Sequence, residues 1–364
     1  MGDIQMGGTP VKVALAQVSP RFLDTPATLD KACSHIAEAA QNGADIIAFP
    51  ETYLSAFPIW CAFAAPIRNH DYFCRFAASS VLLDGPELRK LAEAARAAGI
   101  WVSMGFNERS AASVGCIWNS NVIFNRKGEL VNHRRKLVPT FFEKLVWANG
   151  DGAGLEVVDG DIGRVGMLIC GENTNPLARY ALMSQGEQLH LSSYPPVWPT
   201  RDPSEPTNYD LAEAIRIRSA AVAFEGKCFN AVVAGVVDST TRAAIADGIP
   251  GGGELLDACD QGISLVIGPR GTTMASSTPG DETLLYCDID LGECVEPKQF
   301  HDLVGGYNRF DIFQFHVDRR PRPPATFTDA AGSPLAQRQV ITVAGDSQSG
   351  ATHDDSQSGE ERRD

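Results

Sequence analysis

The chain has 364 residues, of which 44% are hydrophobic and 21% charged, and this composition excludes wholesale disorder. Its formal net charge of −14 disfavours nucleic acid or an anionic membrane surface as the main partner, because like charges repel. The longest apolar run, Ala231–Val237, is far shorter than the ~20 residues of a membrane helix. The N-terminus has no basic region followed by an apolar stretch, so we expect a cytoplasmic protein without a secretory signal.

Strand-like apolar runs alternate with helical patterns along the first 320 residues. In chain order we first expect a strand at 11–18, a helix at 26–42 capped by Thr25 and ended by Gly43, and a strand at 45–50. A helix at 87–98 and strands at 100–106 and 117–124 follow, with a turn at 125–128. The second half has strands at 164–169, 188–192, 229–237, 263–267 and 283–289, with helices at 176–185 and 209–226 between them. This order predicts an α/β core with helices packed on the faces of sheets.

No linker divides the first 320 residues, so we expect one domain over residues 11–320 after a flexible N-terminus at 1–10. Beyond Arg319 the composition changes to a polar extension at 321–364, in which Asp-Ser-Gln-Ser-Gly occurs twice. This extension is too poor in apolar groups to offset its ordering entropy, and we expect it to be largely disordered.

The nine cysteines are odd in number and include no Cys-x-x-Cys pair, and the seven histidines are scattered. Such spacing favours neither a disulfide scaffold nor a structural zinc site. Most of these cysteines should therefore be small hydrophobic residues of the interior.

Two candidate reactive residues stand directly after apolar strands. Glu51 follows Ile-Ile-Ala-Phe-Pro, and Cys170 follows Val-Gly-Met-Leu-Ile. In α/β sheets ligands bind at the carboxyl ends of strands. A helix beginning at Pro176 would place Cys170 near a positive helix end, which would lower the pKa of the thiol and favour the nucleophilic thiolate. The alternative is that Cys170 merely ends a core strand.

Burial would make the carboxylate of Glu51 a stronger base, suited to general-base catalysis, although an exposed loop acid is the other interpretation. Lys136 lies in the basic run His133-Arg-Arg-Lys136, which taken alone is typical of a solvated surface. The occurrence of all three residues in this order favours a shared site.

Four segments stand out in chain order: Phe49-Pro-Glu-Thr-Tyr53, Arg135-Lys-Leu-Val-Pro-Thr140 with Glu143 and Trp147, Cys170-Gly-Glu-Asn173, and Tyr307-Asn-Arg309. In these segments the chain resembles the nitrilase superfamily of carbon–nitrogen hydrolases, and within it the nitrilase branch, over about residues 11–320. One departure is Gly171, where nitrilases commonly carry tryptophan. This change implies a wider pocket, and both an acid and an amide are possible products.

The resemblance implies a four-layer αββα–αββα sandwich formed when two αββα subunits pair, with helices 176–185 and 209–226 at the interface and with larger spiral homo-oligomers. It implies a Glu51–Lys136–Cys170 triad supported by Glu143, and no metal or organic cofactor. The remaining positions that match the family's substrate pocket are Phe57, Thr140, Trp147, Gly171, Asn173 and Pro195.

The implied reaction is hydrolysis of a small-molecule nitrile to a carboxylic acid and ammonia through a cysteine thioimidate and thioester. Three alternatives share the resemblance: an amidase or carbamoylase, a hydratase that releases amide, and a catalytically silent, filament-forming relative.

Overall fold

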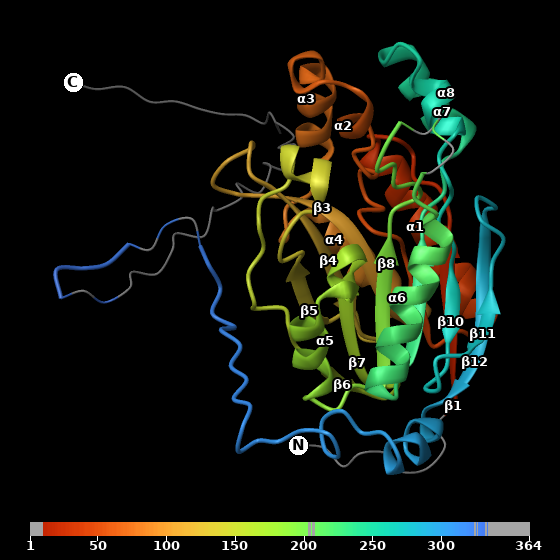
Figure 1. The fold of residues 1–364 in the computed structure, drawn as a ribbon. Helices are drawn as coiled ribbons and strands as arrows, with labels where there is room; N and C mark the ends of the chain where they lie inside the picture. Colours follow the sequence, from red (N-terminus) through yellow and green to blue (C-terminus); the bar gives the residue numbers. More distant parts are fainter. Residues whose placement is uncertain are drawn as a thin grey trace, which may run out of the picture. The chain divides into compact units, whose positions relative to one another are not determined.

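Two six-stranded sheets, each with helices on its outer face, build the unit that spans residues 10–322 (Figure 1). The computed structural model describes residues 10–202, 205, 208–323, 325, 327–331 and 333. The chain divides into two compact units, Met1–Arg322 and Pro323–Asp364, and every element named below belongs to the first. The predicted flexible segment before Pro10 and most of the predicted C-terminal extension lie outside the described residues.

The first sheet has the order β12-β1-β2-β3-β4-β5. Its strands are β1 (Pro10–Gln17), β2 (Ile46–Ala48), β3 (Trp101–Arg109), β4 (Ile117–Phe124), β5 (Leu130–Arg135) and β12 (Thr283–Asp290). The second sheet has the order β11-β10-β9-β8-β7-β6. Its strands are β6 (Val158–Gly160), β7 (Gly163–Ile169), β8 (Leu189–Tyr194), β9 (Phe229–Ala234), β10 (Leu265–Ile267) and β11 (Thr273–Ser276).

Strand β1 shows why the sheets stack. Its odd positions Val11, Val13 and Leu15 belong to the main core cluster, to which both sheets contribute. Its even positions Ala14 and Ala16 pack with the apolar residues of helices α1 (Thr25–Gln41) and α4 (Pro86–Ala98). Because successive side chains of a strand point to opposite faces, one apolar strand serves two layers at once.

Helices α5 (Pro176–Met183) and α6 (Leu211–Gly226) contribute the apolar residues that pack on the second sheet. The layers therefore run helix, sheet, sheet, helix, and the predicted αββα fold is confirmed. Pairing of two such subunits into a four-layer sandwich stays a prediction. In the described residues, every helix falls short of the length and apolar character that a membrane span requires.

The predicted elements are present, with boundary shifts that have local causes. Helix α1 is capped by Asp24, whose carboxylate accepts from the Ala27 amide at 3.0 Å, and not by Thr25. Strand β5 was not predicted, because its sequence Leu-Val-Asn-His-Arg-Arg carries almost no apolar pattern. Short helices also follow two of the strands. After β2 come α2 (Trp60–Phe63) and α3 (His70–Ser79), and after β9 come α7 (Ser239–Gly248) and α8 (Gly252–Asp257).

Candidate active site

Four buried polar side chains meet between the two sheets, and three of them stand near the end of a strand. Glu51 follows β2, Lys136 directly follows β5, and Cys170 directly follows β7 as the first residue of a short 3₁₀ turn. Glu143 lies in the 3₁₀ turn Phe141–Leu145. The sheet topology therefore brings together residues that are up to 119 positions apart in the chain, from Glu51 to Cys170.

A glycine lets the loop of Glu51 sit against the first sheet. A Cβ atom at Gly105 in β3 would lie 2.2 Å from the Pro50 carbonyl oxygen and 2.6 Å from the Thr52 amide nitrogen. No side chain fits at such distances, so residue 105 must be glycine for this loop to keep its path. Thr52 takes a positive φ of 47°, which turns the chain sharply after Glu51.

Lys136 holds the two carboxylates together. Its Nζ donates to Glu51 Oε1 at 2.9 Å and to both oxygens of Glu143 at 2.8 and 2.7 Å. Asn119 Nδ2 donates to the same Glu51 oxygen at 2.6 Å. Only 1% of Lys136 is exposed to solvent, which excludes the interpretation of the basic run as a solvated surface at this position.

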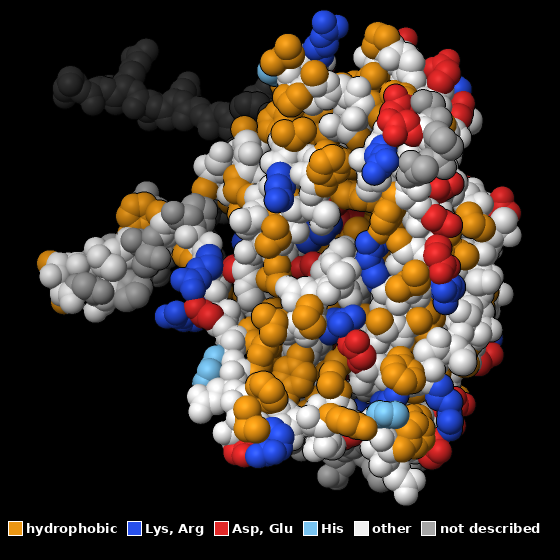
Figure 2. Space-filling view, in the orientation of Figure 1, with side chains coloured by type: hydrophobic (Ala, Val, Ile, Leu, Met, Phe, Trp, Pro, Cys, Tyr) orange, Lys and Arg blue, Asp and Glu red, His pale blue; other side chains and the backbone are white. Residues whose placement is uncertain are grey.

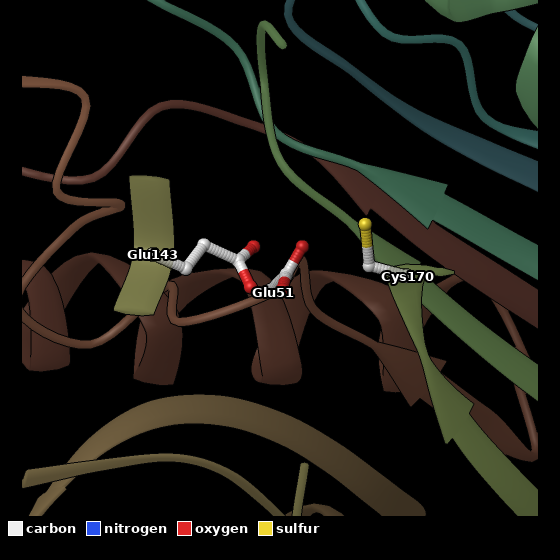
Figure 3. A group of neighbouring side chains, drawn as sticks. All are labelled: Glu51, Glu143 and Cys170. Carbon is white, nitrogen blue, oxygen red and sulfur yellow. The ribbon is translucent and has the colours of Figure 1, made fainter. Parts of the chain in front are cut away.

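The sulfur of Cys170 completes the group (Figure 3). Its Sγ and one carboxylate oxygen each of Glu51 and Glu143 all lie within 4.8 Å of one another. The second oxygen of Glu51, Oε2, is buried and has no hydrogen-bond partner in the described part of the chain. A base with a free oxygen therefore lies beside the thiol, which is the geometry that proton transfer needs.

The charge state of the site differs from the sequence prediction. Burial raises the pKa of the Cys170 thiol well above its ordinary value and Glu51 raises it further, while Lys136 lowers it. The prediction of a low thiol pKa is therefore wrong. The first amides of α5 do not act on the thiol, because the Asn175 side chain caps them and accepts from Leu177 N at 3.0 Å. Burial is therefore the largest influence on the pKa of the Cys170 thiol.

Although burial disfavours its charge, the pKa of Lys136 is raised well above the ordinary value by the carboxylates of Glu143 and Glu51. Burial raises the pKa of Glu143 to about 7, against the opposing effect of Lys136. The resting site thus combines a neutral thiol with a lysine that stays charged, so the thiol must give up its proton to a base for the sulfur to act as a nucleophile.

Cys170 is held in a backbone conformation that non-glycine residues rarely adopt, with φ of 49°. Asn173 supports it, because its Nδ2 donates to the Cys170 carbonyl at 3.0 Å and to the Leu168 carbonyl at 3.3 Å. Its Oδ1 contacts His190 Nε2 at 2.9 Å and Ser192 Oγ at 3.0 Å. The contacts of this predicted pocket residue are thus with the protein itself, beneath the nucleophile.

The predicted pocket position Gly171 lies beside open space. A Cβ atom there would meet a single neighbour within 4 Å, Thr140 Oγ1 at 3.2 Å. Thr140, also a predicted pocket position, is exposed and caps the turn that carries Glu143, whose Oε2 accepts from the Thr140 amide at 2.5 Å. The structure therefore brings Gly171 and Thr140 together at the edge of the charged group.

Aromatic side chains form one wall of the site. Phe57 contacts Trp147 edge-on with centroids 5.6 Å apart, and Phe142 and Trp198 stack at 4.5 Å. The Trp147 ring also lies 5.8 Å from Lys136 Nζ, close enough for a cation–π contact. Phe142 and Trp198 were not singled out from the sequence, because isolated aromatic residues carry no local signal of a pocket.

Two hollows flank this wall. A small cavity is lined by Glu51, Phe57 and Pro196, and an open hollow of about 300 Å³ is lined by Phe63, Phe142 and Leu255 among others. The rings of Phe57 and Phe142 touch edge-on at 6.3 Å, so the aromatic wall lies between the two hollows. Pro195, the predicted pocket residue, is buried directly after β8, next to the Pro196 that lines the small cavity.

The cluster of Glu51, Glu143 and Cys170 has the donor atoms that a metal ion could use. The ammonium of Lys136 already lies against both carboxylates, so a metal cation would have to displace or approach a buried positive charge. This donor set is therefore better suited to holding an ammonium than a metal. All nine cysteines are free thiols.

Comparison with known proteins gives the following relatives. Residues 12–299 match the carbon–nitrogen hydrolase family. An arylacetonitrilase of Fusarium vanettenii is 33% identical over 86% of this chain and 94% of its own length. An aliphatic nitrilase of Rhodococcus rhodochrous is 34% identical over 88% of this chain and 83% of its own length.

Solved structures agree on the fold. A carbon–nitrogen hydrolase of Helicobacter pylori G27 superposes with a TM-score of 0.64 at 18% identity, over 84% of this chain and 97% of that one. The C. elegans NitFhit protein gives a TM-score of 0.65 at 18% identity, over 88% of this chain and 70% of that one. At such identities the likeness concerns the fold alone.

Proposed function

The chain belongs to the carbon–nitrogen hydrolase family, as its motifs predict, and we propose that it is a nitrilase, which converts a small organic nitrile to a carboxylic acid and ammonia. One observation carries the proposal: Glu51, Lys136, Glu143 and Cys170 converge in one buried cluster, in a chain whose relatives are nitrilases. The names of those relatives cover both arylaceto- and aliphatic nitrilases, so they do not select the substrate.

In the proposed reaction Glu51 is the general base. Its free Oε2 takes the proton of the Cys170 thiol as the sulfur attacks the nitrile carbon, and passes that proton to the nitrile nitrogen. The product of this step is a covalent thioimidate. Because the thiol is neutral at rest, the sulfur needs this base to become a nucleophile.

Water then adds to the thioimidate carbon, again losing a proton to Glu51, and the resulting tetrahedral species expels ammonia to leave a thioester. A second water releases the acid and restores the thiol. The overall balance is one nitrile and two waters to one acid and one ammonia. Lys136, with the Gly171 amide as a second donor, would stabilise negative charge on the tetrahedral species, a contribution of about 3 kcal/mol for one donor.

Glu143 keeps Lys136 charged and aimed at the reacting atoms through its two hydrogen bonds. The wall of Phe57, Phe142 and Trp147 would bind the organic part of the nitrile through apolar contact. The space beside Gly171 would admit a bulky substituent where a tryptophan would exclude it.

The test is a panel of aromatic, arylacetic and aliphatic nitriles, each assayed for ammonia, with acid and amide identified by mass spectrometry. Cys170→Ala should abolish ammonia release, whereas the matched variant Cys228→Ala, at another buried cysteine, should retain it. Turnover retained in Cys170→Ala would exclude the mechanism. Amide as the sole product would indicate a hydratase, and hydrolysis of amides but not nitriles an amidase or carbamoylase. A folded protein inactive on every substrate would indicate a silent relative.

We also propose a homodimer, extending to spiral homo-oligomers, in which α5 and α6 face the partner. In support, Leu177 on α5 and Ile217 and Phe224 on α6 are 64%, 55% and 48% exposed. Figure 2 shows hydrophobic side chains gathered over the face on which these helices lie. Sedimentation of the wild-type protein and of Ile217→Lys should give a dimer or larger species and a smaller species, respectively. A cytoplasmic location likewise stays a prediction.

A further inference from the structure

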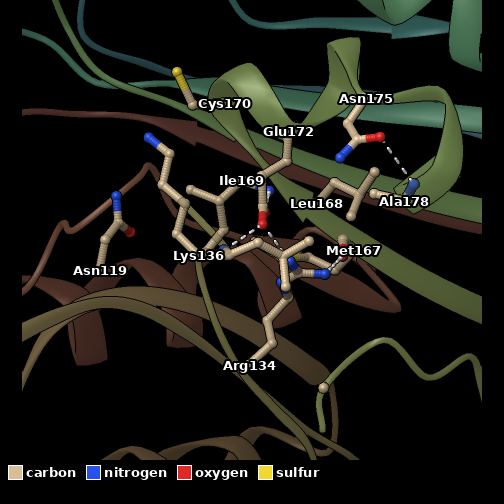
Figure 4. Close-up of polar contacts among 12 residues, drawn as sticks. Asn119, Arg134, Lys136, Met167, Leu168, Ile169, Cys170, Glu172, Asn175 and Ala178 are labelled. Carbon is tan, nitrogen blue, oxygen red and sulfur yellow. Dashed lines mark hydrogen bonds and ion pairs between the residues drawn. The ribbon is translucent and has the colours of Figure 1, made fainter. Parts of the chain in front are cut away.

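The carboxylate of Glu172 is a buried group that the proposed reaction does not use. Glu172 stands two residues after Cys170, and 5% of its side chain is exposed. Figure 4 shows the carboxylate pointing away from the Cys170 sulfur, toward Arg134 and the end of β7. A substrate bound at the sulfur would therefore not meet it, and its role must come from its contacts with the protein.

Those contacts join the two strands that carry the reactive groups. Oε1 accepts from the backbone amide of Leu137 at 2.7 Å, and Oε2 accepts from the backbone amide of Ile169 at 2.9 Å. Leu137 is the residue directly after Lys136, and Ile169 is the residue directly before Cys170. One planar carboxylate thus bridges the first sheet to the second, one residue away from the ammonium and from the thiol.

Arg134 locks this bridge in place. Its Nη2 donates to Glu172 Oε1 at 2.6 Å and its Nη1 to the Met167 carbonyl of β7 at 2.9 Å. Only 2% of Arg134 is exposed. Hydrogen bonds between ionised partners are shorter and stronger than neutral ones. The guanidinium and the carboxylate together therefore resist displacement of β5 relative to β7.

From this geometry we propose that Glu172 is a positioning residue, which sets the spacing between the Lys136 ammonium and the Cys170 sulfur. The inference rests on the proposed function, because the spacing matters only if these two groups act on one substrate. A displacement of about 1 Å at a reacting group can cost 10²-fold in rate, so the effect of losing the bridge should fall on kcat.

A second buried carboxylate supplies a matched control. Glu108 is 2% exposed and binds Ser120 Oγ at 2.6 Å, His133 Nε2 at 2.7 Å and the Arg135 guanidinium. It thus resembles Glu172 in burial and charge pairing, and it even contacts the residue before Lys136. Its partners, however, are all side chains of the first sheet, so it does not join Lys136 to Cys170.

The experiment compares Glu172→Gln with Glu108→Gln. Glutamine keeps the size of the side chain, but its NH₂ group cannot accept a hydrogen bond, so one of the two bridged amides loses its partner. Both variants should lower Tm. Glu172→Gln should lower kcat by about 10²-fold with KM within about threefold, whereas Glu108→Gln should keep both within about threefold.

A readout without nitrile separates this inference from the proposed function. The rate at which iodoacetamide alkylates Cys170, followed by peptide mass spectrometry across pH, depends on how near Lys136 lies to the sulfur. Glu172→Gln should shift this pH profile and Glu108→Gln should not. Should Glu172→Gln fail to fold, Glu172→Asp retains the charge but is too short to reach both amides, and the same shift is expected.

If Glu172→Gln, or in its place Glu172→Asp, lowers Tm but leaves kcat and the alkylation profile like those of the Glu108 variant, Glu172 is merely structural and the inference is overturned. Failure of the proposed function has a different signature, which is ammonia release that persists in Cys170→Ala.

Discussion

Removal of the Lys136 ammonium by Lys136→Met tests the electrostatics of the site most directly. Lys136 makes three hydrogen bonds to two fully buried carboxylates, at 2.7 to 2.9 Å. Methionine has a similar length but no charge, so Glu51 and Glu143 would face each other without a cation. Breaking a buried ion pair from one side costs about 3–5 kcal/mol, and we expect a loss of this size in the free energy of unfolding at pH 8.

The loss should depend on pH with a definite sign. Burial already raises the pKa of Glu143 to about 7, and Lys136 is the group that opposes this rise. In the variant the folded-state pKa of Glu143 should be higher still. At low pH, protonation of Glu143 removes its repulsion from the Glu51 carboxylate and so reduces the loss of stability. This reduction disappears as pH rises through the pKa of Glu143. The penalty should therefore be smaller at pH 5.5 than at pH 8, by up to about 1.4 kcal/mol, the most that a group with a wild-type pKa of about 7 can contribute between these two pH values.

Urea unfolding at the two pH values measures both effects. Lys227→Met is the control, because Lys227 is 2% exposed but lies over the Phe224 ring at 3.7 Å rather than between carboxylates. That variant should show no comparable pH dependence. The kcat of Lys136→Met should fall by about 10³-fold or more. A penalty below about 1 kcal/mol at pH 8, equal to that at pH 5.5, would refute the view that this ammonium holds two charged carboxylates together.

Three further outcomes are expected. The stability of wild type relative to Glu143→Gln should fall as pH rises from about 4.5 to about 7, because the folded wild type binds an extra proton in that window. Urea unfolding measures this, and a difference independent of pH would contradict the raised pKa of Glu143. Gly105→Ala should displace the loop of Glu51, since its Cβ would lie 2.2 Å from the Pro50 oxygen, and should lower both Tm and kcat; wild-type values would show that the loop can give way. Gly171→Ala should keep the wild-type Tm, because it meets only the Thr140 hydroxyl, but should reduce kcat/KM for bulky nitriles more than for small ones; an equal effect on both would place the substrate elsewhere.

Much of the architecture could be predicted from local pattern. Apolar runs at 11–18, 117–124 and 164–169 are strands, and Gly99 ends its helix with a φ of 66°, as a glycine stop should. Strand β5 escaped prediction because it pairs with β4 through its backbone, while its side chains are mostly polar. Backbone pairing with a strand elsewhere in the chain does not require a periodic apolar pattern in a strand's own sequence.

Within the site, the sequence alone determined which residues stand at strand ends and which family their order indicates, and the family is confirmed. Only the tertiary structure decided that Lys136 is buried between two carboxylates, that the Cys170 thiol is neutral at rest, and that Glu172 binds the backbone beside both. The physical reason is that periodicity and turn chemistry are local, acting within a few residues. Solvation and charge interactions depend on distances in space, and here the two sheets set those distances between residues far apart in the chain.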